Sequence, residues 1–244
     1  LANQLAAHRD FDPADVDEVA AFWGAPNIAR QAGLKAVDQF EAVHDGRVKA
    51  LWIIGTNPAV SLPDTTRVQE ALERCPLVVV SDCIAETETT RFADVLLPAQ
   101  GWGEKDGTVT NSERRVSRQR RLLEPVGAAM PDWWIVCEVA SRLGFGDAFA
   151  YSNPAEIFRE HAALANGGSR QLDLGRLREL SDSAYNALAP IQWGGPSCFS
   201  SGQFSTPDGR ARFVPIAAHV PVQQPEPAYP LILNTGRLRD RWHT

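Results

Sequence analysis

Three short apolar runs separated by stretches of helical character limit the fold more than any other feature of the chain. The first run extends from Ala50 to Ile54 and breaks at Gly55, the second is "LVVVSD", and the third extends from Val95 to Leu97. Strands that alternate with helices predict a parallel sheet, because a helical crossover returns the chain to the edge where the previous strand began. The unbroken first run further predicts a strand covered on both faces.

Helices are expected on either side of this sheet. Apolar residues recur at helical spacing in four segments, which are "DPADVDEVAAFWG", "KAVDQFEAVHDG", "TRVQEALERCP" and "PDWWIVCEVASRLG". In the last of these, Asp132 occupies the position of an N-cap, whose side chain would accept a hydrogen bond from the first turn. The combination predicts an α/β domain with a parallel, Rossmann-like sheet and flanking helices.

Composition divides the chain into four expected parts. These are an α/β domain over residues 1–150, an irregular α+β covering segment over 151–214, a proline-rich linker over 215–230, and the first strand of a C-terminal β-rich domain over 231–244. Within the second part, "PDG" predicts a hairpin turn before a strand from Ala211 to Val214. The sequence starts without Met and stops just after the strand-like "LILNTG", so we expect both ends to lie inside a longer protein.

Charge and cysteine spacing exclude several classes of protein. A net charge of −6 and a pI near 5.4 argue against general nucleic-acid binding, and no apolar run approaches the roughly 18 residues of a membrane span. The four cysteines and five histidines are too scattered to predict a metal site. A dense basic run contains Arg114, Arg115, Arg118, Arg120 and Arg121. Because no aromatic residues are interleaved with it, we expect these arginines to pair internally rather than to bind a polynucleotide.

Polar loops follow the three predicted strands and should meet at one carboxyl edge, where open α/β sheets bind ligands. Asn57 follows the first strand, Ser81 and Asp82 end the second, and Lys105 follows the third. A carboxylate can accept two hydrogen bonds from a ribose diol or a guanine edge, and a lysine can hold a phosphate. The loops lack G-x-G-x-x-G, which speaks against a simple NAD or FAD site.

Each of these residues also has an ordinary structural interpretation. Asn57 precedes a proline and suits a turn. Lys105 could pair at the surface with Glu104 or Asp106, a contact worth about 0 to 1 kcal/mol. Asp132 needs no ligand if it caps its helix. From the residues alone, both interpretations stay open.

Several long ordered motifs resemble the molybdopterin oxidoreductase family. They are "GTNPAVSLPD", "VVVSD", "ADVLLPAQGWGEKDGTVTNSERRVSRQRRLLEP", "PDWWIVCEVASRLG", "TPDGRARFVP" and "LNTGRLRDRWHT". The likeness covers most of the chain, is weaker over residues 151–203, and is greatest to the catalytic subunits of bacterial assimilatory nitrate reductases. It implies α/β domains wrapped around two molybdopterin guanine dinucleotides that share one molybdenum.

The resemblance also implies which residues contact the cofactor. They are Asn57, Ser81, Asp82, Lys105 and Asp132, together with Thr235, Gly236, Arg237, Trp242, His243 and Thr244 from the loop that opens the C-terminal domain. No catalytic residue and no metal ligand falls in this sequence, because the family's 4Fe-4S cysteines and its molybdenum-binding residue lie upstream. The stretch alone is therefore expected to be inactive.

For the whole protein, the resemblance implies two-electron reduction of nitrate to nitrite in cytoplasmic nitrate assimilation. Electrons would arrive from a donor protein or reductase subunit through iron-sulfur centres. A periplasmic nitrate reductase or a formate dehydrogenase of the same family is the first alternative. A non-catalytic nucleotide-binding module is an alternative from a different class.

Overall fold

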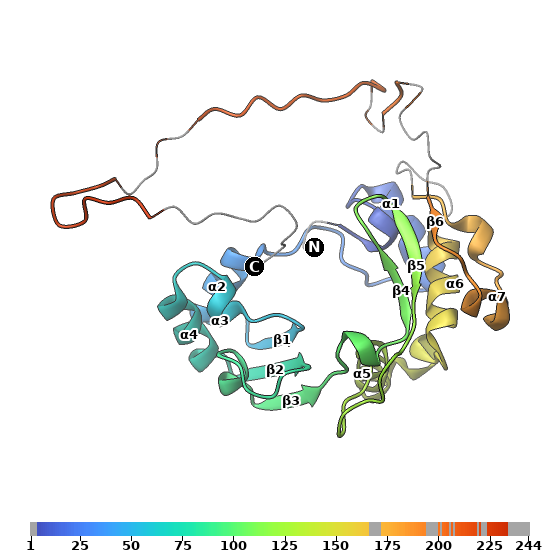
Figure 1. Cartoon of the computed structure of the whole chain (residues 1–244), viewed down its shortest axis with the longest axis horizontal. Coiled ribbons are helices and arrows are strands. Elements are labelled where there is room, and N and C mark those ends of the chain that lie inside the picture. Colours follow the sequence, from blue (N-terminus) through green and yellow to red (C-terminus); the bar gives the residue numbers. More distant parts are fainter. Residues whose placement is uncertain are drawn as a thin grey trace.

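The computed structural model describes residues 4–165, 172–193, 200, 202–204, 206, 208–218, 220 and 224–233. Figure 1 shows two groups of elements, with strands β1, β2 and β3 beside helices α2, α3 and α4, and strands β4, β5 and β6 beside helices α6 and α7. Helix α5 lies between the two groups. No helix of the described residues is long and apolar enough to cross a membrane.

The first group contains the predicted parallel sheet. Its strands β1 (Ala50–Ile54), β2 (Leu77–Asp82) and β3 (Val95–Pro98) pair in that order, and all run in the same direction. A parallel bridge between Ala99 and Met130 then extends the sheet by one position beyond β3. The prediction of a parallel sheet is confirmed, and the segment that leads into α5 joins its far edge.

Helices cover one face of this sheet and form the first core. α2 (Ala36–His44) and α4 (Thr65–Arg74) pack against each other, and the short α3 (Pro58–Ser61) contacts α4. The buried cluster comprises Phe40, Val43, Leu51, Ile53, Ala59, Val68, Ala71, Leu72, Cys75, Val78 and Val80.

The opposite face of the sheet is only partly covered, which differs from the prediction for β1. Burial along β1 alternates, with Leu51 and Ile53 buried while Trp52 is half-buried and Ile54 is exposed. Within the described part of the chain, helices therefore bury only one side of this strand. A continuous apolar run does not distinguish the two cases, because the second face also carries large apolar side chains.

A second, antiparallel sheet was not predicted from the sequence. Its strands β4 (Gly107–Thr110), β5 (Arg115–Gln119) and β6 (Ile191–Gln192) pair in the order β4-β5-β6. Helices α6 (Pro154–Leu164) and α7 (Asp182–Asn186) lie beside this sheet (Figure 1). Its core contains Val116, Ala155, Phe158, Ala162, Ala165, Leu172, Leu174, Leu177 and Tyr185. The domain boundaries expected from composition stay predictions.

The remaining elements are α1, α5 and several short helical turns. α1 spans Pro13–Trp23 and ends at Gly24, whose φ of 60° lies in the left-handed region that suits glycine. α5 spans Asp132–Ala140. The short turns are Ala6–His8, Thr90–Phe92, Trp102–Glu104, Ser141–Phe145, Gly146–Phe149 and Gly175–Leu177.

The hairpin expected around "PDG" forms its turn but not its strand. The backbone N–H of Phe204 donates to the carbonyl of Gly209 at 3.0 Å, whereas residues 211–218 form no strand. The expected strand from Ala211 to Val214 is therefore wrong. Leu231, Ile232 and Leu233, the described part of the other expected strand, are likewise not in a strand. A strand needs a ladder partner for its backbone groups, and no neighbouring described strand supplies one.

Candidate functional site

Polar segments at the carboxyl end of the parallel sheet define the candidate site. Asn57 follows β1, Asp82 is the last residue of β2, and Lys105 lies in the segment after β3. Asp132 comes two residues after Met130, which is bridged to the far edge of the same sheet. Because the first three positions follow parallel strands, they belong to the edge where such sheets bind ligands. Asp132, which was expected from the family resemblance, adds a fourth segment to the three loops expected from the strands.

Lys105 and Asp132 form an ion pair across this edge. The Lys105 ammonium lies 2.5 Å from Asp132 Oδ2, and the two side chains are 31% and 36% exposed. Asp132 is the first residue of α5, so its negative charge also lies at the favourable end of the helix dipole. The expectation that Asp132 is the N-cap is wrong. Pro131 occupies that position with extended backbone angles, and the Asp132 side chain makes no capping hydrogen bond.

The two acids beside Lys105 have local partners of their own. Glu104 Oε2 accepts a hydrogen bond from the backbone N–H of Gly101 at 2.8 Å, which closes the short turn before Lys105. Asp106 Oδ1 accepts from Arg118 at 2.7 Å. Lys105 therefore pairs with neither sequence neighbour, although a surface pair with one of them was the ordinary interpretation.

Asp82 presents a carboxylate that is only partly used by the protein. It is half-buried, and Oδ1 accepts from the backbone N–H of Ile84 at 3.0 Å. Within the described ranges, Oδ2 has no hydrogen-bond partner. The second oxygen can therefore accept hydrogen bonds from a ligand at the sheet edge.

Ser81, the neighbour of Asp82, has a different environment. Its side chain is buried, with 1% of the residue exposed, and its Oγ accepts from the Trp52 indole N–H at 2.8 Å. Its backbone carbonyl accepts from Gly55 at 2.9 Å. The structure thus gives the Ser81 side chain a contact that joins β1 to β2, rather than a position on the open edge.

Asn57 links the loops after β1 and β2. Its Nδ2 donates to Glu88 Oε2 at 2.8 Å, and its Oδ1 accepts from the Thr89 hydroxyl at 2.6 Å. Thr89 is buried and also accepts from the backbone N–H of Ala59. The hydrogen bond from Asn57 lowers the pKa of Glu88 below the ordinary glutamate value. Both ends of the Asn57 amide are therefore engaged in holding the loops.

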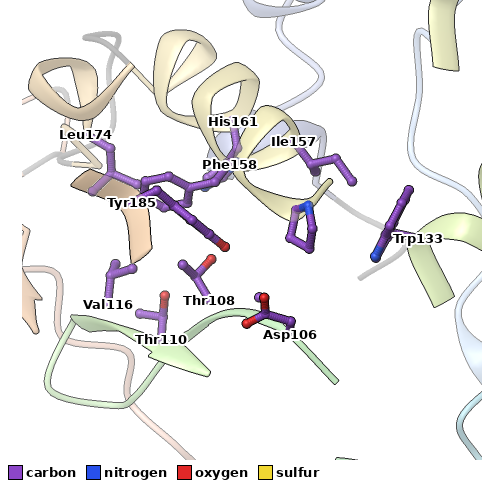
Figure 2. Close-up of a pocket in the computed structure, with 12 residues that line it drawn as sticks. Asp106, Thr108, Thr110, Val116, Trp133, Ile157, Phe158, His161, Leu174 and Tyr185 are labelled. Carbon is purple, nitrogen blue, oxygen red and sulfur yellow. The ribbon is translucent and has the colours of Figure 1, made fainter. Parts of the chain in front are cut away.

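A crevice of about 450 Å³ lies between the second sheet, α5 and α6. Figure 2 shows Ile157, Phe158 and His161 on α6, and Trp133 on α5 across from them. It is lined by Asp106, Gly107, Thr108, Thr110, Val116, Trp133, Pro154, Ile157, Phe158, His161, Leu174 and Tyr185. Of the site residues expected from the sequence, none of those that the structure describes lines it. The short and polar "GTVT" forms one wall as β4 and gives no clear sequence signal for the crevice.

The expectation of internal pairing holds for Arg118, whose side chain is only 2% exposed and pairs with Asp106. It does not hold for Arg121, which pairs at the surface with the exposed Glu124 at 3.3 Å. Among the described residues, no group of histidine, cysteine or acidic side chains could hold a metal ion. The remaining expected cofactor residues, Thr235, Gly236, Arg237, Trp242, His243 and Thr244, lie outside the described residues.

The fold is a mixed α/β unit, with polar residues at the carboxyl edge of its parallel sheet. Residues 5–142, more than half of the chain, match the sequence model of a family described as molybdopterin oxidoreductase. The chain belongs to the molybdopterin oxidoreductase family.

Curated relatives align along most or all of the chain. A nitrate reductase of Klebsiella oxytoca is 52% identical over the whole chain, and the assimilatory nitrate reductase catalytic subunit of Bacillus subtilis is 33% identical over the whole chain. The alpha subunit of an F420-dependent formate dehydrogenase of Methanocaldococcus jannaschii is 38% identical over 81% of it. The chain spans 29%, 35% and 29% of these three proteins, respectively.

A solved structure supports the fold independently. Acetylene hydratase from Pelobacter acetylenicus superposes on 70% of this chain and 23% of its own length with a TM-score of 0.54. The sequence identity is 21%, so the likeness concerns the architecture alone.

Proposed function

We propose that this chain is part of the catalytic subunit of a molybdenum enzyme that reduces nitrate to nitrite in cytoplasmic nitrate assimilation. The observation that carries the proposal is the 52% identity, over the whole chain, to a protein named nitrate reductase. The assimilatory assignment draws support from the Bacillus subtilis relative, which also aligns over the whole chain.

The residues at the sheet edge fit a guanine dinucleotide. Asp82 has a carboxylate oxygen without a protein partner among the described residues, which suits the N–H groups of a guanine edge or a ribose diol. Lys105 has three N–H donors and gives one of them to Asp132, so that, as far as the described residues go, two are left for a phosphate. Asp132 would hold the ammonium in place. Asn57 and Ser81 would support the same site indirectly, because their side chains fix the loops after β1 and β2.

The remaining parts of the proposal concern the whole protein. Residues 235–237 and 242–244 would contact cofactor from the next domain, and a 4Fe-4S cluster with ligands outside this chain would pass on electrons from a donor protein. When bound, molybdopterin guanine dinucleotide with its molybdenum supplies the two-electron chemistry, while the protein supplies binding and orientation. The role of this chain is therefore to bind and orient one dinucleotide, and we expect it to be inactive alone.

Formate oxidation is the second candidate reaction. It is favoured by the formate dehydrogenase relative, which is 38% identical over 81% of the chain. The two candidates share the proposed dinucleotide edge, so the geometry of this edge does not separate them. The relative named nitrate reductase aligns over the whole chain, which favours nitrate as the substrate.

Activity of the purified full-length protein separates the candidates. We expect nitrate-dependent oxidation of reduced viologen, with nitrite as the product, and no formate-dependent reduction of oxidised viologen. Formate oxidation without nitrate reduction would refute the proposed reaction while leaving the dinucleotide edge intact. Protein that contains molybdenum but lacks both activities would refute both candidate reactions.

A further inference from the structure

Arg118 connects the second sheet and α7 to the segment that carries Lys105. Its side chain is 2% exposed and lies on β5. It donates hydrogen bonds to Asp106 Oδ1 at 2.7 Å, Asn186 Oδ1 at 3.2 Å and the Tyr185 hydroxyl at 3.3 Å. The guanidinium carbon also lies 4.1 Å from the centre of the Tyr185 ring, within the range of a cation–π contact.

Two of the groups held by Arg118 come directly after Lys105 in the sequence. One is the Asp106 carboxylate, and the other is the backbone carbonyl of Gly107, to which an Arg118 guanidinium nitrogen donates. A further hydrogen bond to the carbonyl of Gln119 fixes the guanidinium relative to β5 itself. The backbone on the C-terminal side of Lys105 is therefore tied to a buried and well-packed group.

The arrangement is better suited to fixing geometry than to adding stability. Arg118 Nε is buried and has no hydrogen-bond partner among the described residues, so burying this guanidinium carries an uncompensated cost. The ion pair is buried on the arginine side only, because the Asp106 side chain is 46% exposed, and an ion pair open to solvent contributes little to folding. The hydrogen bonds of the buried guanidinium can nevertheless specify one arrangement of the chain. The arrangement specified here is that of Asp106 and Gly107.

We propose that Arg118 is a positioning residue for cofactor binding, which acts through Lys105. This inference rests on the proposed function of Lys105 at the dinucleotide edge. By holding Asp106 and Gly107, Arg118 fixes the backbone from which the Lys105 ammonium reaches Asp132 and the cofactor phosphate. Helix α7 is thereby coupled to the dinucleotide edge through one side chain.

A double-mutant cycle in the full-length holoenzyme tests this inference. The variants are Arg118→Met, Asp106→Asn, Lys105→Ala, and each of the first two combined with Lys105→Ala. Arg121→Met is the matched control, because it removes an arginine of the same run whose one partner among the described residues is the exposed Glu124. The measurements are molybdenum per polypeptide and the half-time for release of guanine nucleotide at a fixed temperature.

The inference predicts effects that do not add. Arg118→Met and Asp106→Asn should each shorten the release half-time about tenfold, as expected for weakening one charge-assisted contact. In the Lys105→Ala background, either change should shorten it by less than about twofold, because the side chain being positioned is gone. Arg121→Met should match wild type. A purely structural role would instead destabilise both backgrounds equally.

Several results would overturn the inference. A tenfold effect that persists in the Lys105→Ala background would show that Arg118 does not act through Lys105. Wild-type release from both Arg118→Met and Asp106→Asn would show that it does not act on the cofactor. If Arg118→Met does not fold, the Asp106→Asn cycle decides, because that carboxylate is nearly half exposed. Wild-type release from Lys105→Ala alone would refute the proposed role of Lys105 and the inference with it.

Discussion

Substitution of the neighbours Ser81 and Asp82 should affect different properties of the protein, although both were expected to contact the cofactor. Ser81→Ala removes the acceptor for the Trp52 indole N–H, which lies 2.8 Å from Ser81 Oγ in a part-buried position. An unpaired buried donor costs about 1 to 3 kcal/mol. Asp82→Ala removes a half-buried carboxylate that accepts one backbone hydrogen bond, from Ile84, so its cost should be about 0.5 to 1.5 kcal/mol.

Hydrogen exchange and molybdenum content of the full-length protein separate these effects. Ser81→Ala should lower amide protection in β1 and β2, by up to a factor of about 100 for the upper end of that energy range, and should leave the molybdenum content unchanged. Asp82→Ala should lower the molybdenum content, while amide protection should fall by no more than about tenfold. Trp52→Phe tests the same contact from the other side, because it removes the indole donor together with part of the ring, and its effect should not add in full to that of Ser81→Ala.

Loss of molybdenum from Ser81→Ala with normal amide protection would refute this reasoning. It would mean that the hydroxyl contacts the cofactor directly. Normal molybdenum content in Asp82→Ala would equally refute the role proposed for the carboxylate.

Three further predictions concern the scaffold. Leu72→Ala, in the core of α4, should lower the free energy of opening of α4 by about 2 to 5 kcal/mol, measured by hydrogen exchange. Asn153→Ala should cost α6 about 1 kcal/mol by the same measurement, because the Asn153 side chain caps its first turn. The hydrogen bond from Arg67 lowers the pKa of Glu41, so the contact between α2 and α4 should stabilise the fold above the ordinary glutamate pKa. This contribution should be lost as the pH falls through the lowered pKa of Glu41. Arg67→Met should therefore make amide hydrogen exchange in α2 and α4 less dependent on pH in the acid range.

The parallel sheet could be predicted because its signals are local. Each of its strands is a short apolar run, and the β1 and β2 runs matched the observed bounds, Ala50–Ile54 and Leu77–Asp82. The intervening α4 had its apolar residues at helical spacing. Since parallel strands share one carboxyl edge, this order also predicted that the polar residues after them belong to one site.

The contacts within the site could not be predicted, because they join residues distant in the sequence. Lys105 pairs with Asp132, 27 residues away, rather than with either adjacent acid. Asp132 has the chemistry of a cap, but the backbone at Pro131 takes the capping position. Ser81 contacts Trp52 on another strand, which no local pattern indicates.

At the second sheet and the expected hairpin, local sequence signals did not predict where strands form. β4 and β5 are short and polar, and they are held by packing on α6 and by Arg118, so their sequence lacks a clear strand signal. The residues from Ala211 to Val214 have that signal but no described strand to pair with. Strand formation at both places depends on tertiary partners.

A structure of the full-length protein with its cofactor bound tests the central claim most directly. We predict that a guanine dinucleotide lies at the carboxyl edge of the β1–β3 sheet, with N–H donors within hydrogen-bond distance of Asp82 Oδ2 and a phosphate oxygen within that distance of the Lys105 ammonium. A dinucleotide that contacts neither residue, such as one held in the crevice between Trp133 and His161, would contradict this account.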